Sequence, residues 1–268
     1  MRDLALMPDD VAAGVVAVFA DIDDTLTTAG RLPAAAYAAL ERLHGARLAV
    51  VLVTGRPAGW CDLIARLWPV DGVVGENGAF YFAYDHKARR MRRRFVADEP
   101  ERRANRERLD ALKERILAFV PGSAVASDQL YREADLAIDF REDVPPLGEA
   151  EVARIVALFE EAGAVAKVSS IHVNGWFGAY DKLGMARTLA ADVLDLDLDA
   201  ARERIVFVGD SPNDAPLFAF FPNACGVANV RRFAGRMESY PAYVAAAEGG
   251  EGFVEVAARL LRAREDWT

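Results

Sequence analysis

Three short runs of apolar residues, each followed at once by a polar cluster, are the clearest feature of the hydrophobic pattern in this chain. The runs are residues 15–20, 48–53 and 205–208, and they lead into Asp21, Thr54 and Gly209-Asp210. They are rich in β-branched residues and lack strict alternation of polar and apolar positions. This pattern predicts strands that are buried on both faces of a parallel sheet.

Segments with helical character separate or follow these runs, at residues 34–44, 58–67, 183–194 and 251–264. Strands that alternate with helices predict an α/β fold with a doubly wound, Rossmann-like parallel sheet. Ligands bind such sheets outside the carboxyl ends of the strands, and all three polar clusters lie at such an end. The pattern therefore predicts a functional site at that edge of the sheet.

The middle of the chain has a different pattern. A charged helix over about residues 101–119 precedes a strand at 136–140, where polar and apolar residues interleave, and a second helix at about 148–162 precedes further alternating residues. We interpret this region as an α+β insertion between two halves of the sheet domain. The predicted division is a core domain of residues 1–80 and 181–268, with an inserted domain of residues 81–180.

Composition narrows the class of protein. Hydrophobic residues make up 53% of the 268, which predicts a large buried core. The net charge of -9 argues against nucleic acid as a partner, because that work needs a basic surface. Cys61 and Cys225 do not suggest a disulfide framework. The first residues show no signal pattern and no apolar stretch could cross a bilayer, so we expect a cytoplasmic protein without a membrane partner.

The first polar cluster, Asp21-Ile22-Asp23-Asp24-Thr25, places three carboxylates within four positions at a strand end. Like charges so close repel one another unless a cation lies among them, and Mg²⁺ prefers such oxygen ligands. Asp21 would then be free to act as a nucleophile, with Asp23 as general acid and base. The alternative is a solvated acidic turn.

The other clusters are weaker when each is taken alone. Thr54-Gly55-Arg56-Pro57 offers a hydroxyl and backbone amides to a phosphate oxygen, although ordinary helix capping by Thr54 is the simpler interpretation. Lys182, at the start of a helix, is by itself indistinguishable from a surface charge. The loop from Gly209 to Asp214 is either a metal-binding loop or a tight polar turn.

Taken together and in this order, the clusters resemble the haloacid dehalogenase superfamily. The shared pattern is Asp-x-Asp-x-Thr at a strand end, a later strand-end Thr, a Lys, and Gly-Asp-x-x-x-Asp. The resemblance implies that Asp21 is the nucleophile that becomes an aspartyl phosphate. It also implies that Asp23 protonates the leaving group and later activates water, and that Thr54 and Lys182 hold the phosphoryl group.

The resemblance implies a Mg²⁺ site as well. Asp21, the main-chain carbonyl of Asp23 and Asp210 would bind the ion, with Asp214 supporting them and Asn213 holding phosphate or metal. One position differs from the commonest pattern, since Asp24 stands where glycine is frequent.

The position of the insertion, between the Thr54 turn and Lys182, resembles subfamily IIB, the Cof-type members with an α+β cap of the C2B type. Within it, residues 172–177 look most like the sugar-phosphatase branch, which includes sucrose-phosphate and mannosyl-3-phosphoglycerate phosphatases. The resemblance implies a Mg²⁺-dependent phosphoric monoester hydrolase, a monomer or homodimer that acts on a sugar phosphate or a similar small phosphorylated metabolite. The candidate substrate-binding residues are Thr25, Gly55, Arg56, Glu76, Asn77, His172, Asn174, Trp176 and Asn213.

Several alternatives stay open at this point. Glu76 and Asn77 could simply form a turn, and Trp176 could serve core packing. A phosphomutase would use the same aspartyl phosphate, and a phosphometabolite-binding protein could have lost turnover altogether. A basic stretch at residues 86–108 could steer anionic substrates as a positive lid over the site, or it could be an ordinary solvated surface.

Overall fold

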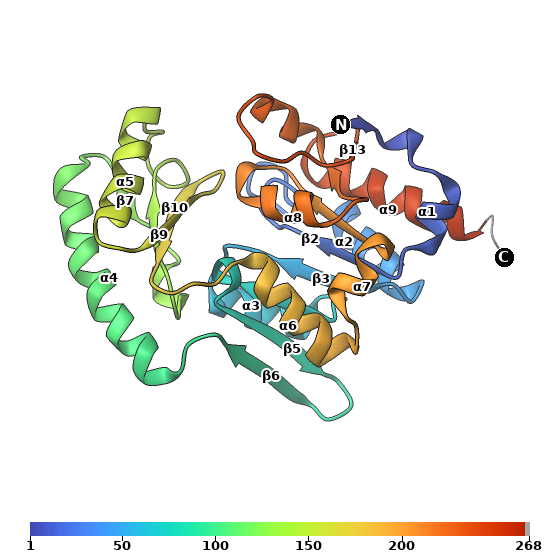
Figure 1. The fold of residues 1–268 in the computed structure, drawn as a ribbon, viewed down its shortest axis with the longest axis horizontal. Coiled ribbons are helices and arrows are strands. Elements are labelled where there is room, and N and C mark those ends of the chain that lie inside the picture. Colours follow the sequence, from blue (N-terminus) through green and yellow to red (C-terminus); the bar gives the residue numbers. More distant parts are fainter. Residues whose placement is uncertain (266–268) are drawn as a thin grey trace.

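A nine-stranded sheet forms the centre of the larger half of the protein in the computed structural model, which describes residues 1–265 (Figure 1). In spatial order its strands are β1 (Arg2–Asp3), β13 (Tyr243–Val244), β12 (Cys225–Gly226), β11 (Ile205–Gly209), β2 (Ala17–Ala20), β3 (Ala49–Val53), β4 (Gly72–Gly75), β5 (Phe80–Asp85) and β6 (Arg90–Phe95). The first seven run parallel, and the β5–β6 hairpin continues the sheet in antiparallel fashion.

Helices cover both faces of this sheet, because the central strands are apolar on both sides. Buried residues of one face pack against α1 (Asp9–Gly14), α2 (Ala34–Gly45), α3 (Ala58–Leu67) and α9 (Gly249–Glu265). The other face packs against α6 (Lys182–Leu194), α7 (Leu198–Ala201) and α8 (Ala215–Phe220). The predicted doubly wound α/β core is therefore confirmed. No helix within residues 1–265 is long and apolar enough to cross a membrane.

Short 3₁₀ helices form several of the connections and termini. They are η1 (Leu4–Leu6), η2 (Glu76–Gly78), η3 (Gln129–Tyr131), η4 (Arg202–Arg204), η5 (Pro212–Asp214) and η6 (Ala228–Phe233). Two of them matter for the site: η2 joins β4 to β5, and η5 follows the end of β11.

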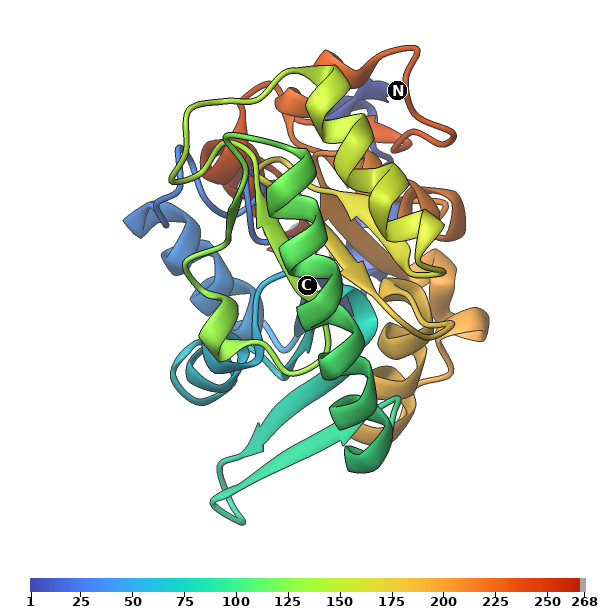
Figure 2. The ribbon, with the colours of Figure 1, turned by 90° about the vertical axis from the view of Figure 1, so that its left-hand side faces the viewer.

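A separate antiparallel sheet forms the smaller half, which we call the cap. Its strands, in order, are β7 (Ala124–Val125), β8 (Leu136–Asp139), β10 (His172–Trp176) and β9 (Val165–Val168). The helices α4 (Glu99–Phe119) and α5 (Glu149–Glu161) pack on its outer face, in front of the sheet in Figure 2. Because side chains alternate along β10, Val173 packs against these helices while His172 and Asn174 lie on the opposite face, toward the large sheet.

The β5–β6 hairpin belongs to the large sheet, although the predicted inserted domain begins at residue 81. The division into residues 1–80 with 181–268 and residues 81–180 stays a prediction. The structure adds that the strands up to Phe95 share backbone hydrogen bonds with the core, so the cap fold itself starts with α4.

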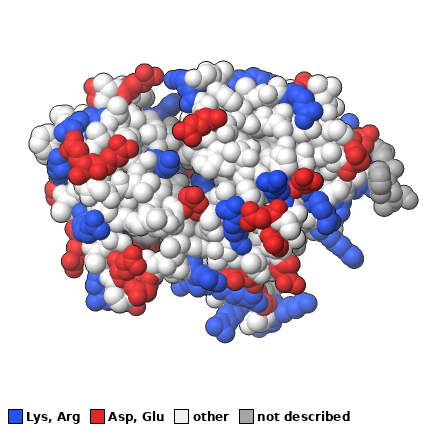
Figure 3. All heavy atoms as spheres, viewed as in Figure 1, with Lys and Arg blue, Asp and Glu red and all other residues white. Residues whose placement is uncertain are grey.

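Six of the ten Lys and Arg residues of the basic stretch 86–108 lie on this hairpin. In Figure 2 the hairpin projects away from the cap, and Figure 3 shows Lys and Arg side chains gathered around it at the lower edge. Arg94 bonds to Asp192 of α6 at 2.6 Å, and Arg93 pairs with Asp62 of α3. For Arg93 and Arg94 of β6 the structure favours the alternative of an ordinary solvated surface, because these side chains are exposed and paired with carboxylates of the core helices.

The cap is fastened to the core through Glu76. Its fully buried carboxylate accepts hydrogen bonds from the amide of Ala58 in the core, at 3.0 Å, and from three cap amides, of Glu133, Ala134 and Asp135, at 2.6 to 3.1 Å. Burial, together with nearby Asp135, raises the pKa of Glu76 to about 7. These bonds fix the cap loop before β8 against the start of α3.

Replacement of Glu76 by alanine should destabilise the protein, because four amide donors lose their common acceptor. We expect a loss of about 3 kcal/mol in the free energy of unfolding, seen as a fall in melting temperature of roughly 6–12 °C. Glu133→Ala is the matched control, since that side chain is exposed and its backbone amide remains. An unchanged melting temperature in Glu76→Ala would contradict the assigned role.

Candidate active site

The carboxyl ends of β2, β3 and β11 bring the predicted catalytic residues together. Parallel register places the end of β2 beside the end of β11, and the amide of Asp21 donates to the carbonyl of Val208 at 2.9 Å. Thr54 continues β3 on the other side of β2, and its amide donates to Val74 of β4. The strand-end argument from the sequence therefore holds for these positions.

Lys182 is a buried member of this group. Its ammonium donates to Asp21 at 3.0 Å and to Asp214 at 2.9 Å. The helix α6 that carries it begins against the η2 turn, where Gly78 has a φ of +107° and a side chain would overlap the carbonyl of Asp181. The glycine therefore lets α6 start close enough for Lys182 to reach the strand ends, and a simple surface charge is excluded.

Burial shifts the pKa values of the charged groups around Lys182. It raises the pKa of Asp21 to about 7, and the attraction of Lys182 offsets only part of the effect of burial and of Asp214. Burial, together with Asp214 and Asp21, also raises the pKa of Asp210 well above its usual range. Burial lowers the pKa of Lys182, but the carboxylates of Asp21 and Asp214 raise it by more, so Lys182 stays protonated.

Asp21, Asp210 and Asp214 each offer a carboxylate oxygen to one small volume, with the three atoms within 4.8 Å of one another. One ammonium among three buried carboxylates leaves a negative charge, which a hard divalent cation with oxygen ligands would neutralise. The donor set therefore fits Mg²⁺. The hydroxyl of Thr25, predicted to bind substrate, instead donates to Asp210 at 3.1 Å and orients this carboxylate.

The carboxylate of Asp23 is not one of these three, although it lines the same cavity as Asp21. Arg56 holds it with Nε at 3.0 Å from both carboxylate oxygens and Nη2 at 2.9 Å from Oδ1. The next residue, Asp24, adopts a φ of +55°, and its amide donates to Thr27 at 2.9 Å. Glycine adopts this left-handed conformation more readily than aspartate does.

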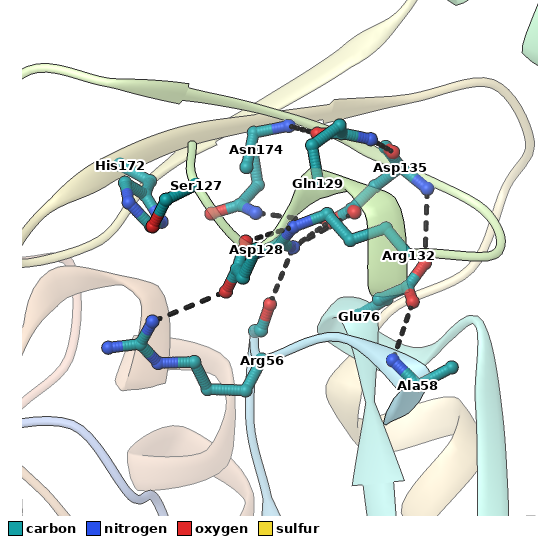
Figure 4. Close-up of polar contacts among 12 residues, drawn as sticks. Arg56, Ala58, Glu76, Ser127, Asp128, Gln129, Arg132, Asp135, His172 and Asn174 are labelled. Carbon is teal, nitrogen blue, oxygen red and sulfur yellow. Dashed lines mark hydrogen bonds and ion pairs between the residues drawn. The ribbon is translucent and has the colours of Figure 1, made fainter. Parts of the chain in front are cut away.

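Arg56 also reaches the cap. Its guanidinium donates to Glu142 at 2.8 Å and to Asp128 at 3.3 Å, as Figure 4 shows for Asp128. The ring of Trp60 lies 4.4 Å from the guanidinium carbon. Thr54 accepts the amide of Arg56 at 3.0 Å, but Pro57 is the residue that precedes α3, so the interpretation of Thr54 as an ordinary helix cap is wrong.

A second arginine, Arg132, lies fully buried between cap and core. It donates to Asp128 and Asp135 and, at 2.9 Å, to the carbonyl of Gly55 (Figure 4). Asn174 donates to Asp135 at 3.0 Å. Sequence reasoning missed Asp128, Arg132, Asp135 and Glu142, because isolated charges in loops carry no signal that separates them from a solvated surface.

The remaining candidates divide into two groups. His172 lies 2.9 Å from Glu142 and, with Asn174 and Asn213, lines a narrow cavity above Asp21. Glu76, Asn77 and Trp176 do not line it. The carboxylate of Glu76 is occupied by backbone amides, Asn77 packs beside Gly55, and Trp176 is buried and stacked on Tyr180. For these three, the geometry supports the turn and packing alternatives.

The cavity lies between core and cap. Asp21, Asp23, Gly55, Arg56, Ser211 and Asn213 line it from the core, and Arg132, Ser169, Ser170, Ile171, His172 and Asn174 from the cap. An outer cleft shares Asp23, Arg56, Ser170 and Ile171 with it and opens toward Asp24 and Gly30. A phosphate ester bound here would present its phosphorus to Asp21 and its remaining group to the cap strand.

Comparison with known proteins supports this description. The family model of haloacid dehalogenase-like hydrolases matches residues 18–116, which include the Asp21 and Thr54 clusters. No curated protein matches significantly. Among solved structures, a protein from Thermoplasma acidophilum has 19% identity and a TM-score of 0.68, and the match covers 92% of this chain and 98% of that one.

Two further structures share the fold. The sucrose-phosphatase of Synechocystis, solved with sucrose and phosphate, has 16% identity and a TM-score of 0.62, with 91% of this chain and 97% of that chain covered. A HAD/COF-like hydrolase from Plasmodium vivax has 17% identity and a TM-score of 0.66, with 97% and 100% covered. Identities this low show the common fold, so the predicted architecture of core and cap is confirmed.

Mg²⁺ should stabilise the protein more at about pH 8 than at about pH 5.5, because the raised pKa values of Asp21 and Asp210 leave protons on the site at the lower pH that a cation must displace. At about a hundredfold excess over the dissociation constant we expect roughly 2.7 kcal/mol, or a melting temperature higher by about 5–10 °C.

Thermal melts with Mg²⁺ and with chelator at both pH values measure this effect. Asp210→Asn should lose the increase, whereas Asp24→Asn, outside the three-carboxylate group, should keep it. An equal or larger gain at the lower pH would contradict the assignment.

Proposed function

Since this chain is haloacid dehalogenase-like both in its matched segment and in its Cof-type fold, we propose that it is a Mg²⁺-dependent phosphoric monoester hydrolase that acts through an aspartyl phosphate on Asp21. The observation that carries this proposal is the buried contact of Lys182 with Asp21 and Asp214. A lysine held in this way positions the nucleophile and offers positive charge to the phosphoryl group. The small phosphorylated substrate is proposed to be a sugar phosphate, and the fold shared with a sucrose-phosphatase supports this.

In the first step, a carboxylate oxygen of Asp21 attacks phosphorus and the bond to the leaving oxygen breaks. Lys182 and the hydroxyl of Thr54 hold the oxygens of the transferring group. Asp23 gives a proton to the leaving oxygen, and Arg56 keeps its carboxylate oriented at the entrance of the cavity. The product is an alcohol, with the phosphoryl group on Asp21.

In the second step, Asp23 takes a proton from a water molecule, whose oxygen attacks the phosphorus and releases Asp21 and inorganic phosphate. Mg²⁺, held by Asp21, Asp210 and Asp214, would offset carboxylate charge and let an anionic phosphate approach. Thr25 supports this arrangement through its bond to Asp210, rather than by binding the substrate itself.

Asp21→Asn should lower the release of phosphate from an aryl phosphate by at least about a thousandfold, because an amide is a far weaker nucleophile than a carboxylate. Asp24→Asn makes the same chemical change in the same loop and should keep most of the activity. Steady-state assays with Mg²⁺ and with chelator measure both. Comparable rates in wild type and Asp21→Asn would rule out the assigned nucleophile. A phosphomutase would move phosphate between positions of a sugar, and a binding protein would show no turnover.

Asp23→Asn should slow the hydrolysis of sugar phosphates roughly a hundredfold more than that of aryl phosphates, because a sugar alkoxide needs protonation to depart and a phenolate does not. The ratio of kcat/KM for the two substrates reports this selectively. Equal loss on both, with phosphoenzyme accumulating, would place the role of Asp23 in the second step alone. If neither rate changed, Asp23 would have no part in the mechanism.

A further inference from the structure

The two guanidinium groups on the leaving-group side of the cavity are already paired with carboxylates. Arg56 binds Asp23, Glu142 and Asp128. Arg132 binds Asp128 and Asp135 and also donates to a core carbonyl. Neither of these side chains is available as a spare cation for a ligand; Figure 4 shows the bonds of Arg132 and the contact of Arg56 with Asp128.

The charge balance of this side is negative. Arg56 and Arg132 contribute two positive charges, and the four carboxylates that they bind contribute four negative ones. Both arginine side chains are at most 6% exposed, so water screens these charges poorly. The remaining ammonium of the site, Lys182, is at the phosphate end and bound to Asp21 and Asp214.

Apart from Arg132, the residues that line the inner cavity from the cap include no acidic side chain, and all but Ile171 have a side chain that can form hydrogen bonds. The cavity wall opposite Asp21 carries the side chains of Ser169, Ser170, Ile171, His172 and Asn174, and the core adds Ser211 and Asn213. Hydroxyl, amide and imidazole groups of this kind can donate to and accept from the hydroxyls of a substrate.

The backbone position of Glu142 is fixed by hydrogen bonds to Asp139. The buried carboxylate of Asp139 accepts the amides of Arg141, Glu142 and Asp143, each at 2.8 Å, and so fixes the turn that carries Glu142. The bond to His172 lowers the pKa of Glu142 to about 2, with help from Arg56 and against partial burial. Glu142 is therefore ionised at neutral pH, and its position does not depend on a flexible loop.

We propose that the site selects phosphate esters whose leaving group is uncharged and hydroxyl-bearing, and discriminates against leaving groups that carry a carboxylate, with Glu142 as a specificity-determining residue. This inference rests on the proposed phosphatase function and narrows its substrate class. An anionic leaving group would meet a net negative, poorly hydrated wall and find no free cation, so both desolvation and repulsion oppose it. A neutral polyol would also lose water, but the serine, asparagine and histidine side chains of the cavity could replace those hydrogen bonds.

One nearby cation lies outside this wall. Arg141 is exposed and lines the outer cleft together with Glu142, whereas Arg56 lines both this cleft and the inner cavity. It can attract phosphate esters in general to the entrance. Arg141 does not line the inner cavity, so the effect of its charge on selectivity is measured with a variant of its own.

Glycerol 1-phosphate and 3-phosphoglycerate are suitable probes, because they share a three-carbon chain and a primary phosphate ester and differ by a hydroxymethyl group against a carboxylate. With Mg²⁺ present, kcat/KM for glycerol 1-phosphate should be at least about tenfold higher. Glu142→Gln should shrink this ratio several-fold, because it removes one negative charge from the wall. Asp143→Asn, next to it on the same turn but outside both cavities, should leave the ratio unchanged.

The outcomes separate the two claims. Turnover of an aryl phosphate with equal or better use of 3-phosphoglycerate by the wild type would overturn the selectivity while leaving the phosphatase function standing. If Arg141→Gln abolished a preference for 3-phosphoglycerate, Arg141 would be the residue that binds the carboxylate of the leaving group. Absence of phosphate release from aryl phosphate and from both probes would sink the proposed function, and the selectivity with it. The wild-type ratio decides even if Glu142→Gln fails to fold.

Discussion

Three carboxylates and one ammonium, buried at the ends of parallel strands, are the constraint on which the rest of the structure depends. Asp21 and Asp210 follow neighbouring strands of the sheet, so the fold forces their charges together. Each charge taken out of water costs several kcal/mol unless it is matched. Lys182, the hydroxyl of Thr25 and the amide of Asp210, which donates to Asp214 at 3.1 Å, supply part of the match. The part left over is negative, and this suits the site to a divalent cation.

The same constraint explains why the core site could be predicted from the sequence. A buried parallel strand has a recognisable composition, and its carboxyl end has a fixed place in the fold, so Asp21, Thr54 and Asp210 could be located without coordinates. Lys182 could not be located by such reasoning alone, because its reach depends on the close approach of α6 to Gly78. Only the order of the motifs, through the family resemblance, identified it.

The charged residues that the cap contributes to the site could not be predicted from the sequence, for a physical reason. Asp128, Arg132 and Glu142 are loop charges, and an ion pair between loops leaves no periodic pattern. Glu76 was predicted as either a substrate-binding or a turn residue, yet its four amide partners come from segments distant in sequence. For the arginines of β6 the sequence left two alternatives open, since the density of charge along a chain does not say which face of the molecule a strand occupies.

Arg56 connects the two halves of the site in a way that Glu76 does not. Glu76 binds backbone amides away from the cavity, so its contacts are the same whatever ligand is present. Arg56 binds Asp23 on the core and Glu142 on the cap, and it lines both the inner cavity and the outer cleft. An ester that reaches Asp21 through the outer cleft would therefore pass the guanidinium of Arg56, which already binds Asp23, the proposed general acid. The segment Thr54-Gly55-Arg56 is therefore not a helix cap: Thr54 is buried at the end of β3, and Arg56 joins the core to the cap through Asp23 and Glu142.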